Sequence, residues 1–135
     1  MTPDFHLRFE LLEVPDSVAS PEVGRVLRVE LHGRRSLENI LQATSEILAR
    51  GVRVEASRFL LVTEWQGFLD HDAALSAGQR VAELGVHPQQ KWAIVPLDPE
   101  RLQDARMTIE GAPSHAVRSR IFLSEDEALA WLRTP

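Results

Sequence analysis

Two stretches near the beginning of the chain alternate between apolar and polar residues. Residues 5–11 (FHLRFEL) do so throughout, and within residues 23–32 the apolar Leu27, Val29 and Leu31 alternate with polar side chains. A period of two is typical of a strand with one buried and one solvated face. Proline, serine and aspartate residues between the two stretches indicate a loop. The pattern therefore predicts a pair of antiparallel strands.

A different pattern follows in the middle of the chain. Residues 59–62 (FLLV) form the longest uninterrupted aliphatic and aromatic run of the sequence. A short continuous apolar run indicates a strand that is covered on both faces, so we expect an interior strand over residues 58–65. Apolar segments at 92–95 and 117–123 predict two further strands.

Helical spacing of apolar residues separates these predicted strands. The first helix is expected to begin after the N-cap Ser36 and to end at Gly51. A second helix should follow Asp70 or Asp72, since either aspartate is a competent N-cap, and should stop at Gly85.

Two more helices complete the prediction. Asp98 followed by proline is typical of a helix start, and Ser124 with Glu127 matches a capping box before the last apolar stretch. The resulting order is ββαβαβαβα. Strands separated by helices favour parallel pairing with the helices on the sheet faces. We therefore expect one α/β domain over residues 1–135, with a single mixed, mostly parallel sheet.

Composition narrows the possible functions. The net charge of −5 argues against nucleic acid as a partner, because such binding needs a cationic surface. The absence of cysteine excludes disulfides, thiol nucleophiles and cysteine metal sites. No apolar run approaches the ~20 residues of a membrane-spanning helix, and the first residues do not resemble a signal peptide. We expect a cytoplasmic protein without an integral membrane segment.

The loops that follow the parallel strands should gather at one edge of the sheet, where α/β proteins usually bind ligands. Trp65, at the end of the central strand, is a candidate for lining a pocket there. Arg34 and Arg35 precede a helix N-terminus and are candidates for holding an anion, since guanidinium groups and free amides attract phosphate and carboxylate. The alternative is a solvated turn that neutralises nearby acids.

The triplet Asp70-His71-Asp72 is the other candidate at this edge. Two carboxylates can orient an imidazole for general base chemistry, which makes a small hydrolase or lyase using His71 with Asp70, assisted by Arg34, one hypothesis. The alternative is an N-capping acid beside an exposed histidine. No histidine spacing matches a zinc motif, and phosphate loops and nucleophile elbows are absent. We therefore assign no catalytic residue, metal or cofactor.

The strand-to-loop run FLLVTEWQGFLDHDA and the ending RIFLSEDEALAWLR resemble the STAS family of small α/β modules. This family includes bacterial anti-sigma-factor antagonists and is related in fold to the CRAL-TRIO lipid-binding domains. The likeness covers roughly residues 22–134. It implies a regulatory or ligand-binding module with a fold of the order given above.

The resemblance also implies a place for a phosphorylation switch. In anti-sigma-factor antagonists an Asp-Ser-Ser/Thr-Gly motif follows the corresponding strand, and its serine is phosphorylated. Here Asp70 keeps the acid, but His71 stands where the serine is expected. Ser76 is the nearest alternative phosphorylation site.

Three functional hypotheses follow. The leading one is a non-enzymatic STAS-like module that binds a protein partner or a small apolar or anionic ligand through Arg34, Arg35, Trp65 and the Asp70–Asp72 triplet. The second is a phosphorylation-controlled regulator of the anti-sigma-factor antagonist type, and the third is the hydrolase or lyase. A homodimer through the exposed edge of the first strand pair is a separate expectation.

Overall fold

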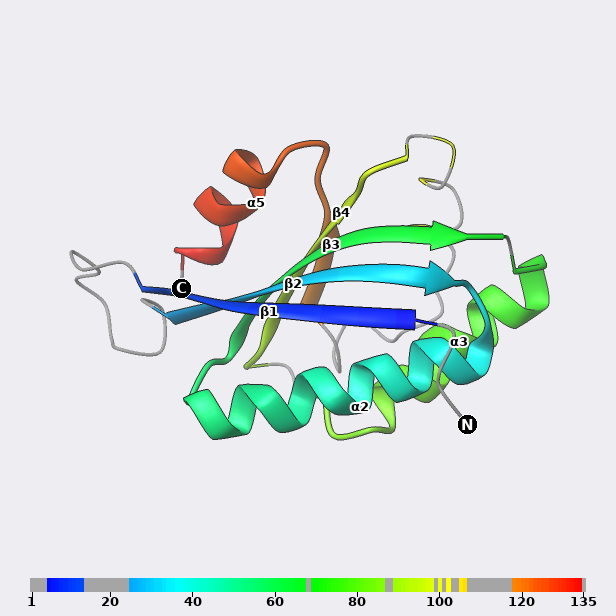
Figure 1. Cartoon of the computed structure of the whole chain (residues 1–135), viewed down its shortest axis with the longest axis horizontal. Coiled ribbons are helices and arrows are strands. Elements are labelled where there is room, and N and C mark those ends of the chain that lie inside the picture. The colour runs from blue at the N-terminus through cyan, green and yellow to red at the C-terminus, as the bar shows by residue number, and fades with distance from the viewer. Residues whose placement is uncertain are drawn as a thin grey trace.

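Five strands in the described part of the chain lie side by side in one mixed sheet (Figure 1). The computed structural model describes residues 5–13, 25–67, 69–86, 89–98, 100, 102, 105–106 and 118–134. The sheet has the order β1-β2-β3-β4-β5, with β1 antiparallel to β2 and all other neighbours parallel. The strands are β1 (Phe5–Glu13), β2 (Arg25–Arg34), β3 (Arg58–Gln66), β4 (Lys91–Pro96) and β5 (Arg118–Ile121).

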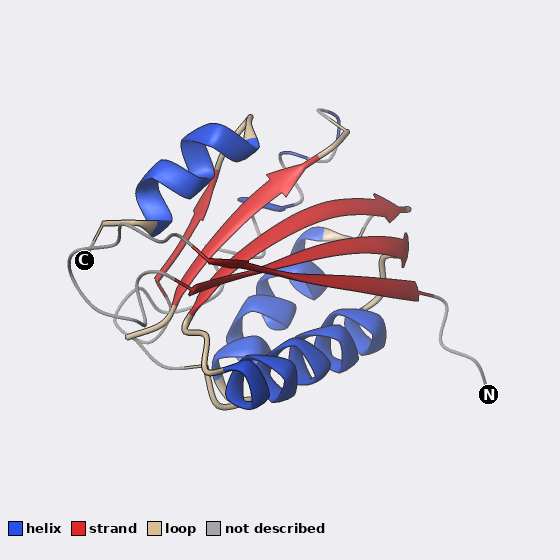
Figure 2. Cartoon of the chain, turned by 60° about the vertical axis from the view of Figure 1, so that its left-hand side comes forward, coloured by secondary structure: helices blue, strands red, loops and turns tan. Residues whose placement is uncertain are grey.

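Helices cover both faces of this sheet. Helices α2 (Leu37–Val54) and α3 (His71–Ala82) lie on one face, and α5 (Glu125–Leu132) lies on the other (Figure 2). The predicted α/β class and the antiparallel first pair are confirmed. The loop expected between the first two strands and most of the helix expected after Asp98 lie outside the described residues.

The central strand is β3, as the apolar run predicted. Phe59, Leu60 and Val62 are between 0% and 3% exposed. Phe59 points toward α2 and stacks on Trp92 of β4, with ring centroids 4.1 Å apart. Leu60 and Val62 belong to the core under α5. Alternate residues of one strand therefore fill two separate apolar layers.

All three described helices begin at the predicted caps. The side chains of Ser36, Asp70 and Ser124 each accept a hydrogen bond from the backbone amide three residues further along, at 3.1, 2.8 and 3.2 Å. Each such bond satisfies an amide donor that the first helical turn leaves free. Of the two aspartates considered for α3, Asp70 is the cap.

The predicted helix ends were wrong. Helix α2 continues through Gly51 to Val54 and is capped by Glu55, whose φ of 57° is left-handed. Helix α3 ends at Ala82, before Gly85. Gly51 is needed for packing: a Cβ atom there would lie 2.8 Å from the ring of Phe59. The glycine therefore lets the helix approach the sheet closely.

Candidate functional site

A cavity of about 110 Å³ lies between the sheet and the α2/α3 layer. Strands β2 to β5 form its floor and the two helices form its walls. Its lining is mainly aliphatic, with Leu31, Ile40, Ile47, Leu61, Val81 and Ile94 among the contributing residues. An apolar space of this kind attracts apolar groups of matching size.

A few polar groups interrupt this apolar lining. Arg35 is the only charged residue among the described residues that line the cavity, and Thr44, Thr63 and Ser119 add hydroxyl groups. The hydroxyl of Thr44 donates to the carbonyl oxygen of Ile40 at 2.7 Å. Trp92 also lines the cavity, and its indole Nε1 is buried with no hydrogen-bond partner in the described part of the chain. A buried donor of this kind is costly unless an acceptor reaches it.

Arg35 owes its position to the end of β2. Its backbone amide donates a hydrogen bond to the carbonyl oxygen of Gln66 at 2.7 Å, which ties the ends of β2 and β3 together. The residue is only 7% exposed and lines the cavity, whereas the neighbouring Arg34 is exposed. The two neighbouring arginines, which the sequence pattern predicts as one anion site, thus lie in different environments.

Trp65 reaches the same cavity from β3. It is 8% exposed and lines the cavity together with Leu61 and Thr63. These three residues are two apart in the strand, so their side chains share one face of the sheet. The structure therefore brings two of the predicted site residues, Arg35 and Trp65, to one cavity.

The Asp70-His71-Asp72 triplet has another position. Asp70 is engaged as the cap of α3, and His71 and Asp72 are exposed on the first turn of that helix. Ser76 is half-buried further along the same helix. None of these four residues is among the described residues that line the cavity. The phosphorylation and hydrolase hypotheses based on them stay predictions.

Sequence reasoning missed Trp92, Thr63 and Ser119 as residues of the cavity. The available signal was the period of two in β3 and β4, which places alternate residues on the face toward α2 and α3. Periodicity identifies the shared face, but it does not show where the helices leave space between them. The cavity itself was therefore not predictable from the pattern.

Lys91 is an unexpected buried cation on the opposite face of the sheet. It is 1% exposed, and its ammonium group donates hydrogen bonds to the carbonyl oxygens of Trp131 and Thr134 at 3.0 and 2.8 Å. It also donates to the Thr134 hydroxyl at 2.7 Å. These acceptors lie at the C-terminal end of α5, where a positive charge is favourable. Lys91 therefore holds the end of α5 onto β4.

Burial, together with the nearby positive charges of Arg58 and Arg118, lowers the pKa of Lys91 from the ordinary value of 10.5 to about 8. Between these two pH values the unfolded chain binds more protons than the folded one, so folding stability should rise with pH. Relative to Lys91→Met, the wild type should therefore gain about 1 kcal/mol of unfolding free energy between pH 8 and about pH 9.

Urea unfolding at several pH values measures this difference, and the subtraction removes the titration of groups that both proteins share. A difference that stays constant over the same pH range would show that Lys91 keeps its ordinary pKa in the folded state.

Comparisons with protein-family models and with curated proteins give no match to this chain. Among the described residues no three histidine, aspartate or glutamate side chains are grouped so as to hold a metal ion. No helix in that part of the chain combines the length and the apolar character needed to cross a membrane. The candidate site therefore rests on the cavity and its lining alone.

Proposed function

We propose that the protein is a binding module whose cavity holds a small, mainly apolar carboxylate. The observation that carries this proposal is the position of Arg35, a buried guanidinium at a cavity whose other described lining residues carry no charge. A guanidinium binds a carboxylate through two parallel hydrogen bonds, which fixes the orientation of the ligand as well as its charge. The apolar lining then receives the rest of the molecule.

The size of the cavity limits the ligand. An engineered apolar cavity of about 150 Å³ holds one benzene molecule, so a space of about 110 Å³ suits a group of that size or slightly smaller. Benzoate and branched acids of four or five carbons combine a group of this size with a carboxylate. Long acyl chains exceed this volume.

The remaining polar groups support a ligand with hydrogen-bond acceptors. The indole Nε1 of Trp92 can donate to an oxygen atom, and the hydroxyl groups of Thr63 and Ser119 can donate or accept. A carboxylate offers about four acceptor positions, so it can receive hydrogen bonds from Arg35 and from a second donor. An uncharged hydrocarbon uses none of these groups.

The placement of the site on rigid elements fits a binding role. Its floor and walls are strands and helices of the core, so the site is formed before the ligand arrives. As part of the proposal we keep the STAS-like character of the module, so that binding of the ligand would regulate a further process. The order of the described strands and helices is compatible with it.

Calorimetric titration with benzoate, benzamide and toluene tests the proposal. Benzoate should bind, and the two uncharged compounds of similar shape should bind at least about tenfold more weakly. Toluene accepts no hydrogen bond, and benzamide offers Arg35 one neutral carbonyl oxygen in place of a charged carboxylate. Arg35→Met should reduce benzoate affinity by a similar factor. Arg34→Met is the matched control, since the neighbouring arginine is exposed, and should leave affinity unchanged.

A second variant tests the cavity itself. Ala43 lines the cavity and is 1% exposed, so Ala43→Leu places additional carbon atoms in the space that the ligand needs. It should abolish benzoate binding while the thermal unfolding transition remains cooperative. Equal affinity for benzoate and benzamide, or equal losses in Arg34→Met and Arg35→Met, would contradict the proposal.

A further inference from the structure

The outer edge of β1 carries a pattern that the binding proposal does not use. This strand pairs with β2 along all nine of its residues, and no other described strand pairs with its opposite side. An edge strand of this length presents unpaired backbone groups that can join another strand. Proteins usually protect such an edge or pair it with another strand. The side chains along β1 therefore indicate which kind of strand can pair with it.

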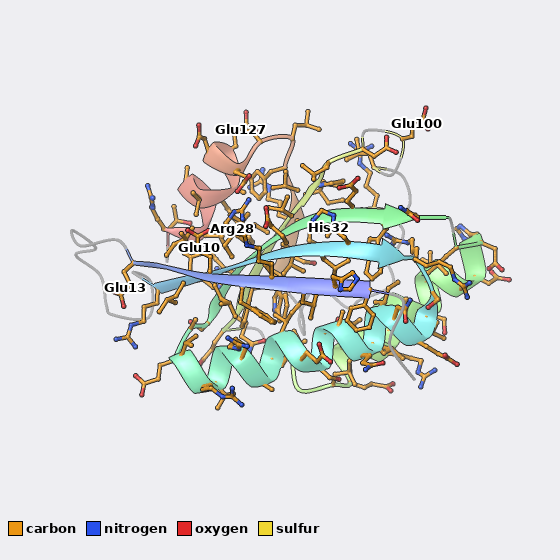
Figure 3. The ribbon with its side chains drawn as sticks, viewed as in Figure 1. Glu10, Glu13, Arg28, His32, Glu100 and Glu127 are labelled. Carbon is orange, nitrogen blue, oxygen red and sulfur yellow. The ribbon has the colours of Figure 1, made fainter. Side chains whose placement is uncertain are left out.

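The two faces of β1 differ in chemistry. Arg8 and Glu10 project on the α5 side, and their side chains are 85% and 61% exposed. Figure 3 shows Glu10 near Arg28 on this side of the sheet. Leu7 and Phe9 pack against the core on the α2 side, and Leu11 of the same face is 39% exposed. Over residues 7–11 the edge thus has one charged row and one apolar row.

We propose that this edge pairs with the same edge of a second copy of the chain, antiparallel and centred on Phe9. In this register Arg8 lies opposite the partner's Glu10, and Glu10 lies opposite the partner's Arg8. On the other face Leu7 lies opposite the partner's Leu11, and the two Phe9 side chains meet. Opposite charges and apolar pairs directly across two strands are favourable.

The charges also select this register among the close alternatives. Centring the pair on residue 8 places Arg8 opposite the partner's Arg8, and centring it on residue 10 places two Glu10 side chains opposite each other. Like charges directly opposite are destabilising. In a closed two-fold dimer each contact between different residues occurs twice. Of these three registers, only the one centred on Phe9 places opposite charges at both of these positions.

The existing contacts of these charges do not prevent the pairing. Arg8 lies 3.8 Å from Glu30, and Glu10 lies 3.8 Å from Arg28. Both are long contacts between partly exposed side chains and contribute little. Arg28 has a closer partner in Glu125, at 2.7 Å. The exposed Arg8 and Glu10 can therefore turn toward a second copy while Arg28 keeps its place.

This dimer is independent of the proposed ligand. No described residue of β1 lines the cavity, which lies under β2 to β5. A single pair of edge strands buries a small interface, so we expect a dimer of micromolar affinity. Failure of one proposal therefore leaves the other standing.

Sedimentation velocity over a concentration series tests the dimer with two charge variants. Arg8→Glu makes both positions acidic, and Glu10→Arg makes both basic, so each variant should dimerise at least about tenfold more weakly than wild type. Mixed in equal amounts, the two variants restore opposite charges at both positions. The mixture should form a heterodimer with an affinity within about threefold of the wild type.

The same series includes a control and three contradicting outcomes. Arg80→Glu changes an exposed charge on α3, a helix that packs beside α2 and not on β1, and should leave the dimer unchanged. A wild-type protein that remains monomeric at its highest soluble concentration would overturn the proposal. So would dimerisation that persists in both single variants, or a mixture that stays monomeric although each variant unfolds cooperatively.

Discussion

Replacing Gly51 by alanine is expected to destabilise the protein by about 2 kcal/mol, although alanine is the better helix former by about 1 kcal/mol. The added Cβ atom would lie 2.8 Å from two ring carbons of Phe59 and 3.2 Å from the carbonyl oxygen of Ala56. Phe59 is 1% exposed and stacked on Trp92, so its ring has little room to shift. The crowding outweighs the gain in helix propensity.

Urea unfolding of Gly51→Ala measures this loss. The second variant Phe59→Leu removes the ring, so Gly51→Ala should cost much less in that background, and the double-mutant cycle isolates the contact. As a helix control, Ser45→Ala on the exposed side of α2 should change stability by no more than about 0.5 kcal/mol. A stabilised Gly51→Ala protein would show that α2 does not approach β3 as closely as described.

Leu132→Ala is expected to cost about 3 kcal/mol, at the end of a helix that is only eight residues long. Leu132 is 0% exposed and belongs to the same core as Leu60 and Val95. Removing its side chain leaves a cavity under α5 that the rigid sheet cannot fill. The result would establish α5 as a full layer of the fold.

Leu123→Ala provides the matched comparison. Leu123 lies just before α5 but is 77% exposed, so its truncation should change stability by less than about 0.5 kcal/mol. Both proteins can be measured by the same denaturant titration. Equal losses in the two variants would mean that α5 is not packed on the sheet as described.

The sequence predicts the strands and helix starts of the described region well. The run at 59–62 led to an interior strand because a strand covered on both faces needs apolar residues at consecutive positions. Ser36, Asp70 and Ser124 were recognisable as caps because their bonds reach only three residues along the chain. Such local chemistry is readable without knowledge of the tertiary structure.

The rest depends on contacts between distant segments. Gly51 resembles a helix terminator, yet its role is set by Phe59, which approaches from the neighbouring strand. Lys91 resembles a surface residue, but the end of α5 buries it and accepts its hydrogen bonds. Arg34 and Arg35 could not be distinguished, because only the packing of α2 and α3 over the sheet decides which of them meets the cavity.

The indole N–H resonances of ¹⁵N-labelled protein during a benzoate titration provide the most direct measurement of the proposed binding site. The chain has three tryptophans; Trp65 and Trp92 line the cavity, whereas Trp131 lies on α5 across the sheet. We expect saturable shifts of the Trp65 and Trp92 resonances, and the larger shift for Trp92 because its Nε1 gains an acceptor. The Trp131 resonance should not shift. Unchanged positions of Trp65 and Trp92 at saturating benzoate would contradict a carboxylate site in this cavity.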